Sequence, residues 1–357
     1  MIRDLVRANI RGLTPYSSAR NEFTGEAEVY LDANENWQGF VSFQEANRYP
    51  DPQARALRAR IEAVLGLPYE NTVIGSGSDE LIDNLIRIFC EPRQDSILVM
   101  NPTYGAYRVF ADINDVKVLS FDLTETFQID LAALQAVLQQ ERAGRSGNGQ
   151  LKMLFICSPN NPTGNAFDLA TIETICTLFD GIVVVDEAYQ DFSAKASAAT
   201  LVAKYENVVV LRTLSKCWGL ASARVGIALA AQAVVSLIAQ VKYPYNLGGP
   251  SQALALEVLS KADEVKATLE LIIEERERMG TALSALGCVE HVYPSDANFL
   301  LVRFDDARAV YRFLAERLII VRDRSSQRHC QGCLRLTVGS IVENERLLAA
   351  LKEYENG

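Results

Sequence analysis

The sequence predicts an α/β fold: a large domain with a mostly parallel β-sheet covered by helices, followed by a smaller α+β domain at the C-terminal end. Two observations carry this prediction. Short apolar runs rich in valine and isoleucine alternate with longer stretches of helical spacing between residues 54 and 229. Each run is continuously apolar, which is typical of strands buried on both faces of a parallel sheet. From about residue 251 the order changes to a long helix followed by short strands and helices.

Length indicates how many domains the chain has, and composition and charge indicate which classes of partner it can bind. The chain has 357 residues, which exceeds most single cores, so we expect an N-terminal arm (1–30), a large domain (31–250) and a small domain (251–357). A hydrophobic fraction of 49% and a charged fraction of 22% are typical of globular proteins. The net charge of −10 argues against nucleic acid or an anionic membrane as a partner. Any anionic ligand must therefore be held by locally placed arginine, lysine or backbone N–H groups.

Several other classes are disfavoured. No apolar run reaches membrane-spanning length, and the first residues lack the apolar core of a signal peptide, so we expect a cytoplasmic protein. Cys330 and Cys333 have C-x-x-C spacing, but a zinc site would need two more ligands, so we predict no metal. The two histidines, His291 and His329, accompany no G-x-S-x-G motif, which disfavours a Ser-His-Asp hydrolase.

The first predicted elements form a possible anion-binding site. A helical stretch at 54–65 ends at Gly66, and a strand at 72–74 leads into a Gly-Ser-rich turn and a helix over 79–89. Ser78 or Asp79 is a natural N-cap, and the N–H groups and dipole at a helix start favour phosphate. A Gly-Ser turn before a helix is nevertheless more often simply a turn.

The alternation continues through the large domain. Further strands are predicted at 96–100, 116–119, 154–157, 182–185, 208–211 and 224–229, with helices at 131–142 and 168–179. In such sheets, ligands bind just past the carboxyl ends of the strands. The polar residues at these ends are Ser78, Tyr104, Asn161, Asp186, Tyr189, Ser215 and Lys216.

The C-terminal third predicts a second unit. Its long helix runs from 251 past 278 with a break near 260–261, and the remaining elements are strands at 288–292, 298–302, 318–321 and 334–338 and helices at 307–317 and from 343. Arg322 and Arg335 lie at or within short strands. An arginine in an apolar strand suggests an anion partner, although a structural salt bridge would explain it equally well.

Lys216 is the centre of the predicted chemistry. It follows the buried strand 208–211, where desolvation makes a lysine nucleophilic enough to form a Schiff base with a carbonyl. An aldehyde cofactor with a pyridine ring and a phosphate tail fits the remaining strand-end residues. Asp186 would pair with the ring nitrogen, Tyr189 and Asn161 with the ring hydroxyl, and Tyr104 would stack on the ring. Ser78, Asp79, Ser215 and Arg224 would hold the phosphate.

Each role has a simpler alternative. Asp186 could cap a helix, Tyr189 could be a core aromatic and Asn161 a turn residue before proline. These alternatives do not explain why all the residues occur together at strand ends.

The motifs resemble a known family. P-N-N-P-T-G (159–164), V-D-E-A-Y (185–189), T-L-S-K (213–216) and A-R-V-G (223–226) resemble the fold-type I pyridoxal-phosphate aminotransferases. The similarity narrows to the histidinol-phosphate aminotransferase family through T-P-Y-S-S-A-R (14–20), L-D-A-N-E-N (31–36), R-Y-P (48–50), G-S-G-S-D-E (75–80), P-T-Y-G-A-Y (102–107), Y-P-S-D-A-N-F (293–299), I-I-V-R-D (319–323) and G-C-L-R-L-T-V-G (332–339).

The resemblance implies a function and partners. It implies a pyridoxal 5'-phosphate enzyme of histidine biosynthesis that exchanges the amino group between histidinol phosphate and 2-oxoglutarate by a ping-pong mechanism. It also implies a homodimer, in which Tyr49 reaches the cofactor phosphate of the neighbouring subunit. The substrate residues of the family match Tyr16, Asn34, Arg322 and Arg335. Two departures, at 217–219 and 242–250, could reshape the substrate pocket.

Related functions stay open at this point. An aromatic amino-acid aminotransferase or a threonine-phosphate decarboxylase has similar motifs. A non-catalytic ligand sensor predicts loss of Lys216 or Asp186, and both are present. A dinucleotide oxidoreductase would need G-x-G-x-x-G after the first strand, which the turn at 75–80 does not match.

Overall fold

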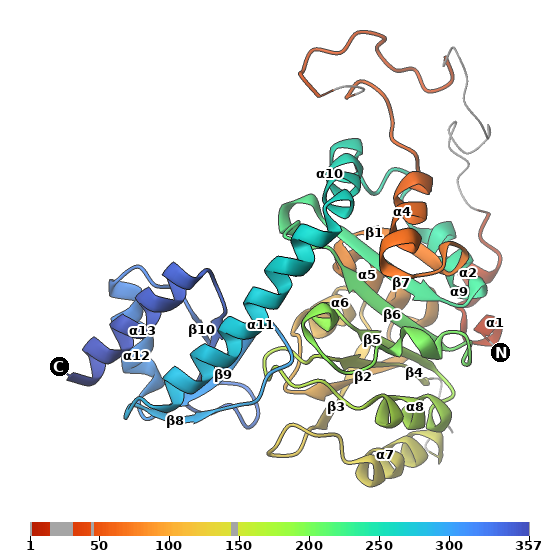
Figure 1. The fold of residues 1–357 in the computed structure, drawn as a ribbon. Helices are drawn as coiled ribbons and strands as arrows, with labels where there is room; N and C mark the ends of the chain where they lie inside the picture. Colours follow the sequence, from red (N-terminus) through yellow and green to blue (C-terminus); the bar gives the residue numbers. More distant parts are fainter. Residues whose placement is uncertain (1, 15–30, 44–45, 144–148, 357) are drawn as a thin grey trace.

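The computed structural model describes residues 2–14, 31–43, 46–143 and 149–356. Its larger part is built on a seven-stranded sheet with the strand order β1-β7-β6-β5-β4-β2-β3 (Figure 1). Strand β7 is antiparallel to both its neighbours, β1 and β6, and the pairs from β6 to β3 are parallel. The predicted mostly parallel sheet is confirmed. The strands are β1 (Thr72–Ser76), β2 (Ser96–Asn101), β3 (Lys117–Asp122), β4 (Leu151–Cys157), β5 (Ile182–Asp186), β6 (Val208–Thr213) and β7 (Val225–Ala230).

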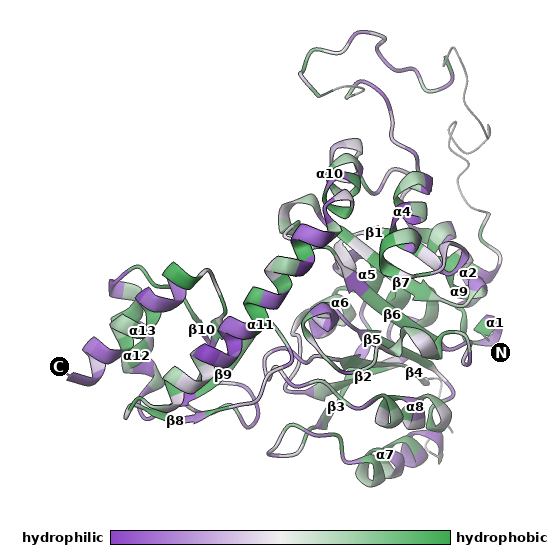
Figure 2. Cartoon of the chain, viewed as in Figure 1, coloured by the Kyte–Doolittle hydropathy of each residue, from purple (hydrophilic) through white to green (hydrophobic). Residues whose placement is uncertain are grey.

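Helices cover both faces of this sheet because alternate residues of each strand point to opposite sides. In β6, Val208 and Val210 pack in one core cluster, while Val209 and Leu211 pack in another. The first cluster contains α4 (Arg55–Leu65), α7 (Leu131–Ala143), α8 (Leu169–Leu178) and α10 (Gly249–Ser260). The second contains α1 (Ile2–Leu5), α2 (Ala8–Arg11), α5 (Gly77–Phe89), α6 (Ala106–Ile113) and α9 (Gln232–Val241). The strands in the interior of the sheet, such as β5 and β7, are mostly hydrophobic, whereas the edge strand β3 is more polar (Figure 2).

The smaller part contains an antiparallel sheet with the order β10-β11-β9-β8. A separate core cluster joins this sheet to the helices that pack on it. The long helix α11 (Ala262–Ser284) leads from the larger part to the smaller one (Figure 1), and it is separated from α10 at Lys261, as predicted. The other elements are β8 (Val289–Val292), β9 (Phe299–Phe304), α12 (Ala307–Glu316), β10 (Arg322–Asp323), β11 (Cys333–Thr337) and α13 (Ile341–Asn356).

Two local predictions are wrong. Helix α5 begins at Gly77, so Ser78 and Asp79 lie in its first turn, and neither is the N-cap. Residues 318–321 form no strand: Leu318 has a φ of 60°, and Leu318 and Ile320 are 82% and 74% exposed. An apolar run predicts a buried strand only if the fold covers it, and the structure leaves these two side chains uncovered.

No helix among the described residues is long and apolar enough to cross a membrane. The cytoplasmic location and the domain boundaries at 30 and 250 stay predictions. Helix α10, which begins close to the second boundary, packs on α4 of the larger part.

Candidate active site

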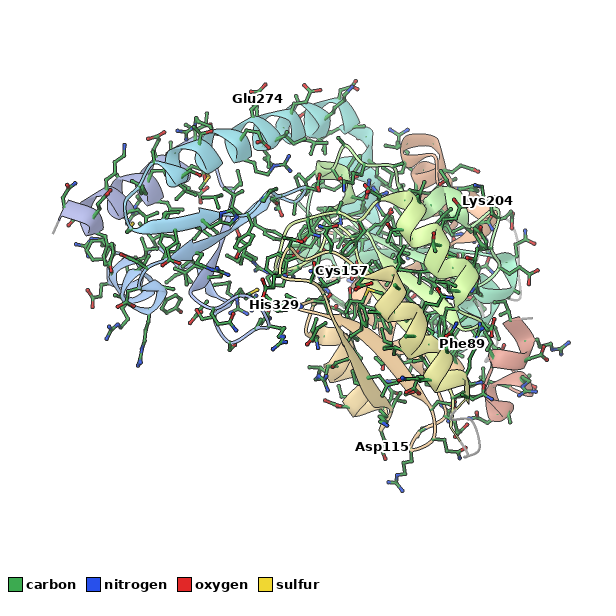
Figure 3. All side chains as sticks on the ribbon, turned by 90° about the horizontal axis from the view of Figure 1, so that it is seen from below. Phe89, Asp115, Cys157, Lys204, Glu274 and His329 are labelled. Atoms are coloured by element: carbon green, nitrogen blue, oxygen red, sulfur yellow. The ribbon has the colours of Figure 1, made fainter. Side chains whose placement is uncertain are left out.

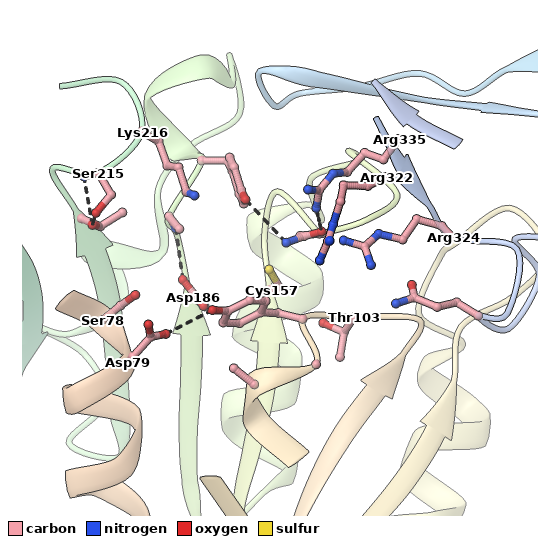
Figure 4. A pocket seen from close by; sticks show the side chains of 18 of the residues that line it. Ser78, Asp79, Thr103, Cys157, Asp186, Ser215, Lys216, Arg322, Arg324 and Arg335 are labelled. Atoms are coloured by element: carbon pink, nitrogen blue, oxygen red, sulfur yellow. Dashed lines mark hydrogen bonds between the residues drawn. The ribbon is translucent and has the colours of Figure 1, made fainter. Parts of the chain in front are cut away.

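A cavity of about 450 Å³ lies where the carboxyl ends of the parallel strands face the smaller sheet. Most of the site residues that we predicted from the strand ends and the motifs line this cavity. Figure 4 shows Ser78 and Asp79 at one end, the arginines at the other, and Lys216 and Asp186 between them. The predicted residues that line it are Ser78, Asp79, Tyr104, Asn161, Asp186, Tyr189, Ser215, Lys216, Arg224, Arg322 and Arg335.

Two predicted residues are not brought to this cavity, and a third lies outside the described part of the chain. Tyr49 is 49% exposed and stacks on Tyr245 with ring centroids 4.4 Å apart, outside the cavity lining. Asn34 is exposed in the segment before α4 and does not line the cavity either. Tyr16 lies outside the described residues.

Asp186 is the buried acid of the site. It is the last residue of β5 and is 3% exposed. The Tyr107 hydroxyl donates a hydrogen bond of 2.7 Å to its Oδ2, and the Ala188 N–H donates one of 3.2 Å to its Oδ1. Burial raises the pKa of Asp186 to about 6, and the Tyr107 hydrogen bond opposes this shift. A carboxylate held at this pKa is a good hydrogen-bond acceptor for a protonated ring nitrogen.

Lys216 follows β6 in the first turn after the strand. Its side chain is open to the cavity, and its Nζ lies 5.5 Å from the centre of the Tyr189 ring. Burial among surrounding atoms lowers the pKa of Lys216, and the nearby Arg335 lowers it further, while Asp186 opposes the shift. A lowered pKa increases the fraction of neutral amine, which is the nucleophilic and basic form.

The end of the cavity beside α5 combines a helix start with an ion pair. The Gly77 N–H donates a 2.8 Å hydrogen bond to the Arg224 carbonyl, and Arg224 pairs with Asp79 at 3.2 Å. The Tyr104 hydroxyl donates to the same carboxylate at 3.2 Å. A Cβ on Gly226 would collide with the backbone of Gly77, so glycine there allows the start of α5 to lie against β7.

The opposite end is lined by arginines from the smaller sheet. Arg335 donates a 2.5 Å hydrogen bond to the Asn161 side-chain oxygen, and Asn161 donates one of 3.5 Å to the Tyr189 hydroxyl. Burial lowers the pKa of Arg335, and the nearby positive charge of Arg322 acts in the same direction. Within the described residues, neither arginine forms an ion pair with a carboxylate, so the structural salt bridge considered for them is not found there.

Several lining residues were not predicted from the sequence, among them Thr103, Cys157, Arg324 and Gln327. Tyr107, which was not predicted either, does not line the cavity but donates its hydrogen bond to Asp186 from beneath it. Tyr107 lies three residues after Tyr104, in the first turn of α6, so its place in P-T-Y-G-A-Y was the available signal. Arg324 follows Arg322 by two residues, which is the spacing of side chains on one side of a strand. Figure 3 shows Cys157 near the middle of the molecule, where the larger and smaller parts meet.

Cys330 and Cys333 lie close to the smaller sheet, and the absence of a metal there stays a prediction. Both thiols are buried and free, and Cys333 is the first residue of β11. Among the residues that the structure places, no group of three or more His, Cys, Asp or Glu side chains could hold a metal ion.

Comparisons with known proteins agree with this geometry. Residues 19–351 match the family model "Aminotransferase class I and II". A histidinol-phosphate aminotransferase of Cytophaga hutchinsonii is 43% identical over 98% of both chains, and one of Parabacteroides distasonis is 44% identical over 99% of both.

Solved structures share the fold. The histidinol-phosphate aminotransferase of Clostridium acetobutylicum matches with a TM-score of 0.77 and 23% identity, covering 88% of this chain and 92% of that one. The enzyme of Sinorhizobium meliloti, solved in complex with pyridoxal-5'-phosphate, also gives 0.77 at 22% identity, with 87% and 83% covered. From the site geometry and the full-length relatives together, this chain belongs to the class I and II aminotransferases, in the histidinol-phosphate aminotransferase family.

Proposed function

We propose that the protein transfers the amino group of histidinol phosphate to 2-oxoglutarate with the help of pyridoxal 5'-phosphate, as a step of histidine biosynthesis. The observation that carries the proposal is the order of groups along one cavity: an anion-binding helix start, then Lys216 and Asp186, then a cluster of arginines. The names of the full-length relatives support this substrate.

The residues fit a planar ring with a phosphate tail. The helix start and Arg224 offer N–H donors and positive charge to a phosphate, and Ser215 lies beside them, hydrogen-bonded to Thr213. Asp186 is a buried acid aimed into the cavity, which suits a ring nitrogen that carries a proton. Tyr104 and Tyr189 add aromatic surface to the cavity lining.

Lys216 would act as both nucleophile and proton carrier. Its lowered pKa supplies the neutral amine that attacks a carbonyl. The same amine can take a proton from the substrate carbon and return it one atom away, because Lys216 is the one lysine among the described residues that line the cavity.

Asp186 would hold the electron-accepting ring in its protonated state. When bound, pyridoxal phosphate supplies a pyridinium ring that accepts the electron pair left on the substrate carbon. Asp186 would stabilise the positive charge on the ring nitrogen, and Tyr107 keeps the carboxylate in place with its 2.7 Å hydrogen bond. Asn161 and Tyr189, which are hydrogen-bonded to each other, would orient the ring hydroxyl.

The arginines would hold the anionic end of each substrate. A guanidinium fork matches both phosphate and carboxylate oxygens, so Arg322 and Arg335 can accept histidinol phosphate in one half-reaction and 2-oxoglutarate in the other.

We also propose a homodimer. The segment before α4 exposes Leu31, Trp37, Phe40 and Val41 by 66–91%, which is unusual for aromatic and aliphatic side chains on a monomer. In Figure 1 this segment extends away from the seven-stranded sheet. Tyr49 lies beyond it, outside the cavity of its own chain, which supports the proposal that it serves the cofactor of a partner.

The experiment is a side-by-side assay of the purified protein loaded with pyridoxal phosphate. Histidinol phosphate, phenylalanine and threonine phosphate are each supplied with 2-oxoglutarate, and glutamate and carbon dioxide are measured. We expect glutamate with histidinol phosphate at the highest kcat/KM and no carbon dioxide. A higher kcat/KM with phenylalanine, or carbon dioxide from threonine phosphate, would overturn the proposed substrate.

A further inference from the structure

Three arginines, rather than two, face the arginine end of the cavity. Arg322 pairs with Arg335 across β10 and β11, so the two side chains lie on the same face of the smaller sheet. Arg324 is two residues beyond Arg322, and its backbone N–H bonds to the Cys333 carbonyl, which continues this register. All three line the cavity, and Figure 4 shows their guanidinium groups pointing into the same space.

The positive charge of this cluster is not balanced within the described part of the chain. None of the three guanidinium groups forms an ion pair there with a carboxylate, and the side chain of Arg324 makes no hydrogen bond there. The Nε atoms of Arg324 and Arg335 are buried without a hydrogen-bond partner, as is the side-chain oxygen of Gln327. Burial lowers the pKa of Arg324, and the nearby Arg335 and Arg322 lower it further. Three close positive groups of this kind are unfavourable until an anion joins them.

We propose that Arg324 is a third phosphate-binding residue, which makes this end of the cavity select a doubly charged phosphate over a carboxylate. The inference rests on the proposed function and extends it to a residue that the motifs did not indicate. A phosphate monoester carries nearly two negative charges at neutral pH and three acceptor oxygens. A carboxylate has one charge and two oxygens, which two guanidinium forks already satisfy.

The test compares two charge-removing variants of the loaded enzyme. Arg324→Gln removes the guanidinium from the cavity. Arg328→Gln is the matched control, because it removes the same charge four residues along the same loop, where Arg328 pairs with Asp122 at 3.2 Å and is 59% exposed. KM and kcat are measured for histidinol phosphate and for 2-oxoglutarate, and thermal unfolding confirms that both variants are folded.

We expect Arg324→Gln to raise KM for histidinol phosphate about 10- to 100-fold, the effect of one lost charge-assisted hydrogen-bond partner, with kcat nearly unchanged. KM for 2-oxoglutarate should rise several-fold less. Arg324→Lys, which keeps the charge but loses the fork, should recover part of the affinity. An Arg324→Gln variant that behaves like Arg328→Gln, or that weakens both substrates equally, would overturn the inference.

A binding measurement separates this inference from the proposed function. Inorganic phosphate is titrated calorimetrically into the loaded enzyme, in which the cofactor already occupies the site beside α5. Weaker phosphate binding in Arg324→Gln, with formate affected less, supports the role of Arg324 even if the wild-type protein does not transaminate histidinol phosphate. Equal phosphate affinity of Arg324→Gln and wild type contradicts that role, whatever the substrate proves to be.

Discussion

On the side of the seven-stranded sheet, the acids of the cavity have partners: Asp79 pairs with Arg224, and Asp186 accepts hydrogen bonds from Tyr107 and Ala188. On the side of the four-stranded sheet, three guanidinium groups have no carboxylate among the described residues. On the first side the charged groups already have partners within the chain, so this side is organised before any ligand binds, as suits a cofactor that stays bound. On the second side an incoming anion supplies the missing negative charge, as suits substrates that bind and leave in turn. Changes on the first side should therefore lower kcat, and changes on the second should raise KM.

The strongest test of this contrast is Lys216→Ala. Removal of this amine, which belongs to the one lysine among the described cavity-lining residues, should lower turnover by about 10⁴-fold or more, because the nucleophile and the proton carrier are both lost. Glutamate formation is the measurement, and the variant should still retain pyridoxal phosphate through the helix start and Arg224. Turnover close to that of wild type would contradict the assignment of the chemistry to this side.

Asp186→Asn should have the next largest effect. A neutral amide cannot stabilise a protonated ring nitrogen, so we expect kcat to fall by about 10²- to 10³-fold and the cofactor to bind less tightly. Single-turnover rates and cofactor dissociation measure the two effects. A change in KM alone would place Asp186 with the substrate groups instead.

The same variant has a consequence for stability in the cofactor-free protein. The pKa of Asp186 is raised from 3.8 to about 6 in the folded state, so its ionisation opposes folding. This unfavourable contribution is absent below about pH 4 and complete above about pH 6. Cofactor-free Asp186→Asn should therefore be more stable than wild type at pH 8, by about 3 kcal/mol at most, with no difference at pH 4. Urea unfolding at the two pH values measures this.

On the substrate side, Arg335→Gln should raise KM for both substrates by about 10- to 100-fold with a smaller change in kcat. The variant removes a guanidinium and its 2.5 Å hydrogen bond to Asn161. Steady-state kinetics with each substrate varied in turn provides the measurement. If kcat fell more than KM rose, the separation of roles between the two sides would fail.

The smallest effect is expected for Tyr107→Phe. Loss of the hydroxyl removes one hydrogen bond that favours the ionised form of Asp186, so the pKa of Asp186 should rise. We expect kcat to fall about 2- to 10-fold and the acidic limb of its pH profile to move to higher pH. Tyr205→Phe is the control, because it removes a hydroxyl that bonds to Glu173 away from the cavity. A pH profile identical to that of wild type would show that Tyr107 does not position Asp186.

Much of the site could be predicted because parallel strands bring their carboxyl ends to one edge. Asp186 and Lys216 follow two adjacent buried strands, so their proximity follows from the apolar runs before them. Tyr107 could not be found in this way, since it lies on α6 and is buried under the site rather than at a strand end. Arg324 was missed because the strand was predicted at 318–321, whereas the structure has the two-residue strand β10 at Arg322–Asp323. The pairing of β10 with β11 continues to Arg324 and turns its side chain to the same side as Arg322.

The sequence by itself determined the strands of the larger sheet, in chain order, and the acid and amine at two neighbouring strand ends, because continuous apolar runs and local turns act over a few residues. Only the tertiary structure decided that the four-stranded sheet turns three arginines toward that amine, and that Tyr49 and Asn34 lie away from it. These placements depend on how α11 and the packed cores set one sheet against the other. The relative placement of the two sheets results from many contacts between residues far apart in the chain, so it cannot be predicted from a local sequence pattern.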